Sequence, residues 1–248
     1  MTEPAELAER VAQACRVLGR LDLTKAATGH VSARAPGSNR ILIRARGPGE
    51  LGVRYTGADQ VIAVDLDGKP IDPAPGLAAP LEVFIHTAIY KARPDVHSVI
   101  HVHPPTIVLF TICDKPLLPL YGAYDPSSVR LALDGIPTFD RSILINSPEL
   151  GAELVATMGG AKTCLMRGHG ITTAAPSVEQ AALYVIWLNE LAAMNYQARL
   201  LGDPRPISQS DQEAMLALRS LESKPTGGAP PTGLEAALWR YYCTLTES

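Results

Sequence analysis

Residues 98–105, Ser-Val-Ile-His-Val-His-Pro-Pro, constrain the fold of this chain more than any other segment. The apolar and β-branched residues are typical of a buried strand, and the two prolines end that strand. Successive side chains of a strand point to opposite faces, so His101 and His103 share one face. Two imidazoles on one face at the end of a strand offer a pair of nitrogen ligands to a divalent metal ion.

We expect the third nitrogen ligand to come from His169. This histidine lies in Arg167-Gly168-His169-Gly170, after a second apolar run at residues 163–166. The flanking glycines allow the backbone to approach a ligand closely. Three histidines with an open position form a catalytic metal site, and zinc, manganese, iron and cobalt all suit such a site. The alternative for each histidine alone is a hydrogen-bonded core residue, but the three together favour the metal site.

Composition narrows the classes of partner and the cellular compartment. The 248 residues carry 22 Lys and Arg against 25 Asp and Glu, and they contain no long basic run. We therefore expect no nucleic-acid-binding surface. No apolar run is long enough to cross a bilayer, and the polar, acidic N-terminus is unlike a signal peptide, so we expect a soluble cytoplasmic protein without membrane contacts. The four cysteines are widely scattered, and we expect them to be reduced.

Hydrophobic periodicity and turn signals predict alternating helices and strands. The predicted helices cover residues 4–21, 80–93, 147–159, 177–201 and 234–245. The predicted strands cover residues 30–34, 40–44, 60–65, 98–103 and 164–166. This order indicates a mixed sheet covered by helices.

The C-terminal part of the chain differs in composition from the rest. Residues 223–233, SKPTGGAPPTG, are typical of a flexible linker. We therefore divide the chain into one large domain at residues 1–222 and a linker with an aromatic tail at residues 223–248. We expect the aromatic helix of this tail to pack against another surface, such as that of a neighbouring subunit.

Five short motifs occur in a defined order along the chain. They are Gly29-His30-Val31-Ser32, Glu82-x-x-x-His86, Arg93-Pro94-Asp95, His101-x-His103-Pro104 and Arg167-Gly168-His169-Gly170. Because these motifs come in this order, the chain resembles the class II aldolase/adducin family. The resemblance covers about residues 7–202. The resemblance implies an α/β fold, a three-layer α/β/α sandwich on a central mixed, mostly antiparallel sheet. It also implies a homotetramer or other homo-oligomer, with sites near subunit boundaries.

The resemblance further implies a metal site at His101, His103 and His169, with Glu82 in the family's acid/base position. Sugar-phosphate members of the family bind phosphate through an asparagine after the glycine of the first motif and through hydroxyl donors before the acid. Here His30 stands at the asparagine position, and residues 79–81 are Ala-Pro-Leu, which offer no hydroxyl. We therefore expect a small carboxylated substrate without a phosphate group.

Arginines are the expected partners of such carboxylates. Alternation in the predicted strand places Arg44 and Arg46 on one face, and guanidinium groups match carboxylates bidentately. We predict that Arg44, Arg46, His30 and Tyr124 contact the substrate. The alternatives are an exposed strand face or a subunit salt bridge for the arginines, turn stabilisation for His30, and ring packing for Tyr124.

The function that the resemblance implies is that of a metal-dependent carbon–carbon lyase. The chain resembles the decarboxylase-type members of the family, so we expect it to decarboxylate a hydroxylated aromatic dicarboxylate such as 3,4-dihydroxyphthalate, in aromatic catabolism. Glu82, with a raised pKa, would transfer the proton, and the metal would hold the developing oxyanion charge. One alternative is an aldolase that cleaves a small non-phosphorylated hydroxy-oxo acid. Another, from a different class, is a non-catalytic adducin-like structural module, against which the three histidines and Glu82 argue.

Overall fold

The computed structural model describes residues 4–35, 37–72, 74–219 and 228–246. The α-helices are α1 (Pro4–Arg20), α2 (Val83–Ala92), α3 (Pro105–Ile112), α4 (Pro126–Leu133), α5 (Pro148–Met158), α6 (Val178–Leu201), α7 (Gln209–Arg219) and α8 (Gly233–Thr244). The strands are β1 (His30–Arg34), β2 (Ile41–Arg44), β3 (Val61–Val64), β4 (Ser98–Val102), β5 (Thr138–Phe139), β6 (Thr163–Met166) and β7 (Gly170–Ala175). Two short 3-10 helices, Val53–Tyr55 and Ala58–Gln60, precede β3. Among the described residues, none of the helices combines the length and the apolar character that a membrane span needs.

The strands form one seven-stranded sheet in the order β3-β2-β1-β4-β7-β6-β5. The paired neighbours are antiparallel except β5 and β6, which are parallel. The prediction of a mixed, mostly antiparallel sheet is therefore confirmed. β4 is the central strand, and its register with β1 and β7 places His101 opposite His30 and Thr172.

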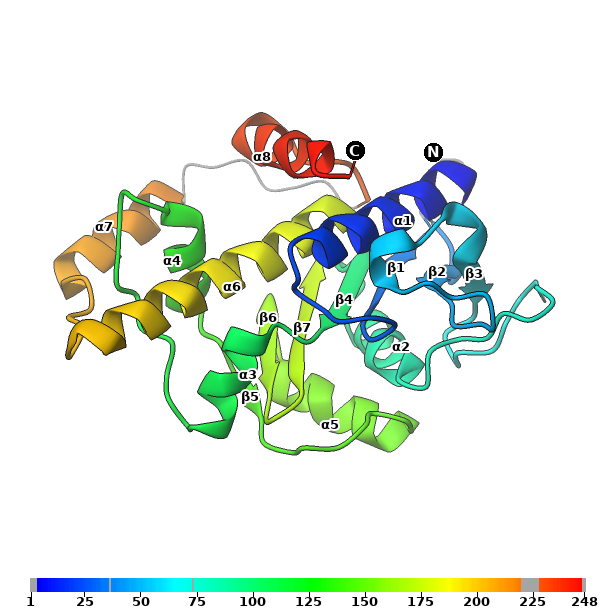
Figure 1. Ribbon diagram of the computed structural model, residues 1–248, viewed down its shortest axis with the longest axis horizontal. Helices are drawn as coiled ribbons and strands as arrows, with labels where there is room; N and C mark the ends of the chain where they lie inside the picture. The colour runs from blue at the N-terminus through cyan, green and yellow to red at the C-terminus, as the bar shows by residue number, and fades with distance from the viewer. Residues whose placement is uncertain (1–3, 36, 73, 220–227, 247–248) are drawn as a thin grey trace.

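Helices cover both faces of the sheet (Figure 1). On one face, α1, α3 and α6 share a core with Ile100 and Ile171. On the other face, α2 and α5 share a core with Val99 and Met166. Because side chains alternate along β4, His101 lies on the same face as Val99, the face that α2 covers. The predicted three-layer α/β/α sandwich is confirmed.

All the predicted helices and strands are present, with bounds close to the expected ones. The serine caps are confirmed, since Ser147 accepts a hydrogen bond from the N–H of Leu150 and Ser177 accepts one from Gln180. The sequence analysis did not predict α3, α4, α7, β5 or β7. The β-branched residues of α3 favour a strand on their own, and Pro105 at its first turn together with packing under α6 stabilises a helix instead.

The C-terminal helix α8 packs on its own chain, over α1 and α6 (Figure 1). Trp239 and Tyr242 contact the core that α1 and α6 share. Gln180 Nε2 of α6 donates a hydrogen bond to Glu235 at 2.8 Å. The expected packing of the aromatic tail is therefore intramolecular in this structure. Residues 223–227 of the predicted linker lie outside the described residues.

Candidate active site

β4 brings the first two candidate ligands to one end of the sheet. His101 is fully buried in the strand, and His103 follows the strand and is half-buried. Pro104 is the N-cap of α3 and Pro105 is its first residue, so the chain leaves the sheet directly after His103. The prediction that the prolines end the strand is confirmed.

His169 lies in the tight turn between β6 and β7. Gly168 in this turn has a φ of 59°, in the left-handed region that favours glycine. A Cβ atom on Gly170 would lie 2.3 Å from the carbonyl oxygen of Val102 and 2.7 Å from Cδ2 of His103. The glycines therefore allow the turn to pack directly against the end of β4, where the rings of His169 and His103 stack with centroids 5.1 Å apart.

Four side chains converge where β4 meets this turn. One ligand atom from each of Glu82, His101, His103 and His169, which we call the Glu/His cluster, lies within 4.8 Å of the other three. The Nε2 atoms of His101 and His103 are 2.9 Å apart. Glu82 Oε2 lies 3.4 Å from Nε2 of His101 and 3.5 Å from Nε2 of His169. Metal–nitrogen bonds of about 2.1 Å give a tetrahedral site edges of about 3.4 Å, so these separations fit one metal ion.

Two imidazoles of the Glu/His cluster, those of His101 and His103, are held in the neutral form that binds a metal. Nδ1 of His101 donates a hydrogen bond to the carbonyl oxygen of Ile171 at 3.0 Å, which leaves Nε2 of the neutral ring bare. Burial lowers the pKa of His101. Burial, together with the neighbouring His101 and His169, lowers the pKa of His103 to about 3. Neutral imidazoles whose ring nitrogens lie this close together are the expected ligands of a divalent metal.

Glu82 is buried at the N-cap position of α2, but its side chain makes no cap hydrogen bond. Instead Oε1 accepts a hydrogen bond from the N–H of Ile145 at 3.0 Å, and Oε2 faces the imidazoles. Burial alone would raise the pKa of Glu82, but its contacts with His101 and His169 and the bond from Ile145 hold that pKa well below its usual range. The carboxylate is therefore held in its ionised form, and the raised pKa expected of a proton-transfer group is not found in this arrangement.

A row of buried polar side chains leads away from the Glu/His cluster beneath α2. His30 Nε2 lies 4.0 Å from Glu82 Oε2, and His30 Nδ1 lies 2.7 Å from Nε2 of His86. Nδ1 of His86 is 2.6 Å from Ser32 Oγ, which is 2.8 Å from Tyr90 Oη. The sequence analysis selected His30 but missed Ser32 and Tyr90, because only the packing of α2 on β1 brings them together. The spacing of Glu82, His86 and Tyr90 at four-residue intervals was the available signal.

Arg44 does not reach the Glu/His cluster. It is buried, and its guanidinium group pairs with Glu50 and donates hydrogen bonds to Thr56 Oγ1 and to the carbonyl oxygens of Ala27 and Gly29. All three guanidinium nitrogens already have partners in the protein. We therefore correct the substrate-binding prediction for Arg44 to a structural role, which fixes the turn before His30.

Arg46 and Tyr124 are both exposed. Arg46 Nε donates a hydrogen bond to the carbonyl oxygen of Ala79 at 3.0 Å, so this arginine borders the loop that leads to Glu82. The ring of Tyr124 packs edge-on against Tyr121, with centroids 5.5 Å apart, as the ring-packing alternative describes. Among the described residues, neither side chain makes a hydrogen bond or ion pair with the Glu/His cluster.

Replacing Arg44 with alanine is expected to lower the free energy of unfolding by about 3 kcal/mol, because Glu50 would keep a poorly solvated charge without its partner. Urea denaturation followed by circular dichroism measures this change. The matched control is Arg46→Ala, at an exposed position, where the change should stay within about 0.5 kcal/mol. Equal stability of the two variants would contradict the structural role of Arg44.

Replacing Gly170 with alanine is expected to cost about 2 kcal/mol of stability, because the new methyl group overlaps Val102 and the ring of His103. Displacement of His103 should also weaken metal binding roughly 10- to 100-fold. Thermal unfolding and a competition titration with a metal chelator measure the two effects. Gly160→Ala is the control, since a Cβ there meets nothing within 4 Å. Equal metal affinity in the two variants would contradict this close packing.

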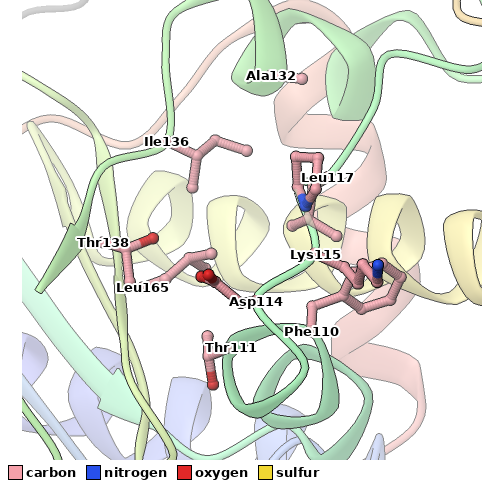
Figure 2. A pocket seen from close by; sticks show the side chains of 10 residues that line it. Phe110, Thr111, Asp114, Lys115, Leu117, Ala132, Ile136, Thr138 and Leu165 are labelled. Atoms are coloured by element: carbon pink, nitrogen blue, oxygen red, sulfur yellow. The ribbon is translucent and has the colours of Figure 1, made fainter. Parts of the chain in front are cut away.

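A separate cavity of about 400 Å³ lies between α3, α4 and β6 (Figure 2). Its lining includes Phe110, Thr111, Asp114 and Ile136. None of the residues of the Glu/His cluster and none of the predicted substrate contacts lines it. We therefore place the candidate active site at the cluster and not in this cavity.

One protein-family domain matches most of this chain. The Class II Aldolase and Adducin N-terminal domain matches residues 9–196. The 3,4-dihydroxyphthalate decarboxylase of Arthrobacter keyseri is 40% identical over 197 residues, which cover 78% of this chain and 79% of the relative. The protein of the same name from Terrabacter sp. (strain DBF63) is 36% identical over 233 residues, which cover 93% of each.

Solved structures show the same fold at lower identity. An aldolase II superfamily protein from Pseudomonas syringae has a TM-score of 0.83 at 23% identity, covering 100% of this chain and 94% of that one. The L-fuculose 1-phosphate aldolase from Glaciozyma antarctica PI12 has a TM-score of 0.76 at 21% identity, covering 98% and 89%. With the domain match and the curated relatives, these findings establish that the chain belongs to the class II aldolase and adducin family.

Proposed function

We propose that this protein is a metal-dependent decarboxylase of a hydroxylated aromatic dicarboxylate such as 3,4-dihydroxyphthalate. The observation that carries the proposal is the convergence of three imidazoles and Glu82 in a chain 36% to 40% identical to decarboxylases of that substrate. His101, His103 and His169 would hold the ion, and zinc, manganese, iron and cobalt all suit these ligands. When bound, the ion supplies a Lewis acid that stabilises an oxygen gaining negative charge.

Glu82 performs the proton transfer in this proposal. Its carboxylate accepts the proton of the substrate hydroxyl group and then delivers that proton to the ring carbon that bears the departing carboxylate. The bond from this carbon to the carboxylate breaks, its electron pair returns to the ring, and carbon dioxide leaves. The product phenolate then takes a proton from water, so that one proton is consumed for each carbon dioxide released.

Arg46 is the residue we propose for the second carboxylate of the substrate. It is exposed, it lies against the loop before Glu82, and Nε is its one hydrogen-bonded nitrogen among the described contacts. The two remaining guanidinium nitrogens can bind a carboxylate. We also propose that the protein works in the cytoplasm as a homo-oligomer, as expected from the sequence and the family.

An aldolase that cleaves a small non-phosphorylated hydroxy-oxo acid is the second candidate. The curated relatives include a 5-methylthioribulose-1-phosphate/5-deoxyribulose-1-phosphate aldolase from Escherichia coli O45:K1, 28% identical over 186 residues, 75% of this chain and 79% of the relative. The same Glu/His cluster could serve that reaction. The residues before Glu82, Ala-Pro-Leu, offer no hydroxyl donor for a phosphate group, which favours a non-phosphorylated substrate.

Turnover of 3,4-dihydroxyphthalate by the metal-reconstituted protein tests the proposal. We expect metal-dependent release of carbon dioxide together with a dihydroxybenzoate product, and no release by chelator-treated protein. Aldehyde or pyruvate formed from hydroxy-oxo acids, without carbon dioxide from the aromatic acid, would support the aldolase. Failure of the protein to bind any of the four metals would support the non-catalytic structural module.

A further inference from the structure

The buried row of His30, His86, Ser32 and Tyr90 restricts where its protons lie. The contact between His30 Nδ1 and His86 Nε2, at 2.7 Å, requires a proton on one nitrogen and a lone pair on the other. Both rings are buried, which disfavours their charged forms, so each ring carries a single N–H. Only two directions of hydrogen bonding along the row satisfy these conditions.

In the first direction, the Tyr90 hydroxyl donates to Ser32 Oγ, and the Ser32 hydroxyl donates to Nδ1 of His86, at 2.8 and 2.6 Å. His86 then carries its proton on Nε2 and donates it to Nδ1 of His30. The single proton of His30 consequently lies on Nε2. In this direction the donors of Tyr90, Ser32 and His86 each have an acceptor within 2.8 Å, and the N–H of His30 faces Glu82 Oε2 at 4.0 Å.

In the second direction, His30 donates from Nδ1 to His86, and His86 donates from Nδ1 to Ser32. The Ser32 hydroxyl can then donate to the carbonyl oxygen of Val99 at 3.3 Å, longer than the usual O–H···O bond of about 2.7 Å. It can also donate to Tyr90 Oη at 2.8 Å, but the Tyr90 hydroxyl then has no acceptor among the described contacts. His30 Nε2 would also present a lone pair to the ionised carboxylate of Glu82, 4.0 Å away. Hydrogen-bond length and charge both oppose this direction.

We propose that Ser32, His86 and Tyr90 are positioning residues that hold His30 with its proton on Nε2, as a neutral hydrogen-bond donor directed at a substrate oxygen beside Glu82. The ring of His30 lies next to that of His101, with centroids 5.2 Å apart, so this donor borders the candidate metal ligands. An N–H fixed in this way recognises an oxygen that bears negative charge, such as a carboxylate or phenolate, and cannot accept a hydrogen bond. Only the identity of that oxygen rests on the proposed function.

The expected kinetic consequence is a graded loss along the row. His30→Phe, which removes the donor, should lower kcat/KM by roughly 100-fold, and His30→Gln, whose amide can donate, should recover part of it. Ser32→Ala should lower kcat/KM by about tenfold, because His86 loses the hydroxyl that fixes its tautomer. Ser98→Ala is the matched control. Ser98 is fully buried on the neighbouring strand and donates to the backbone oxygen of Ser32 at 2.8 Å, but it lies outside the row.

Nitrogen-15 NMR of histidine-labelled protein loaded with metal tests the tautomer directly, without reference to turnover. We expect His30 to show a protonated Nε2 and a bare Nδ1 in the wild type and in Ser98→Ala, and a mixture of tautomers in Ser32→Ala. A proton on Nδ1 of His30 in the wild type, or an unchanged tautomer in Ser32→Ala, would overturn the proposal. Because the NMR spectrum is independent of substrate, a protein that shows the expected tautomer but releases no carbon dioxide would refute the proposed function alone.

Discussion

Replacing His103 with alanine is expected to reduce bound metal from about one ion per chain to background and to lower kcat by roughly 10³-fold or more. His103 contributes one of the three convergent imidazoles, and two remaining imidazoles hold a divalent ion much less tightly. Its half-buried position makes this substitution easier to tolerate than one at the fully buried His101. Elemental analysis of protein dialysed against a fixed metal concentration gives the occupancy.

His97→Ala is the matched control for this experiment. His97 lies just before β4, is half-buried and is outside the Glu/His cluster. This variant should retain both the metal and the activity. Full metal occupancy in His103→Ala, at a concentration that just saturates the wild type, would remove His103 from the ligand set.

Replacing Glu82 with glutamine should lower kcat by roughly 10²- to 10⁴-fold while the bound metal remains. The amide has the size of the carboxylate, and its oxygen can still accept the hydrogen bond from Ile145. What it loses is the capacity to accept and deliver a proton. Steady-state kinetics should therefore show a large effect on kcat and a small one on KM.

The control for this variant is Glu153→Gln, a carboxylate exposed on α5 that pairs with Arg141. Its activity should match that of the wild type. Metal content separates two roles of Glu82, since occupancy preserved in Glu82→Gln is expected of a proton carrier. A loss of metal comparable with that of His103→Ala would instead make Glu82 a ligand.

The sequence predicted the parts of the site that depend on local geometry. Alternation along β4 and the prolines after it place His101 and His103 together from spacing alone. The glycines around His169 indicated a close approach of backbone, and the structure shows that approach at Gly170. These features need no knowledge of distant contacts, because each follows from the strand, the turn and the residues that flank them.

The parts that escaped prediction depend on partners distant in the sequence. Alternation predicted that Arg44 and Arg46 share one face of the strand. It could not show that Glu50 and Thr56 contact the guanidinium group of Arg44. The row from His30 to Tyr90 likewise arises from the packing of α2 on β1. The five elements that were missed are either short or lack a clear apolar period, so packing determines their conformation.

The candidate metal ligands and the proposed substrate contacts lie on different segments of the chain. Of the three candidate ligands, His101 lies in β4, His103 directly follows β4, and His169 lies in the turn that joins β6 and β7 of the same sheet. The proposed substrate contacts are His30, the first residue of β1, and Arg46, which follows β2 and donates a hydrogen bond to Ala79 in the loop before α2. Because the two groups lie on different segments, substitutions at His30 or Arg46 should change substrate preference while metal binding by the three histidines is retained.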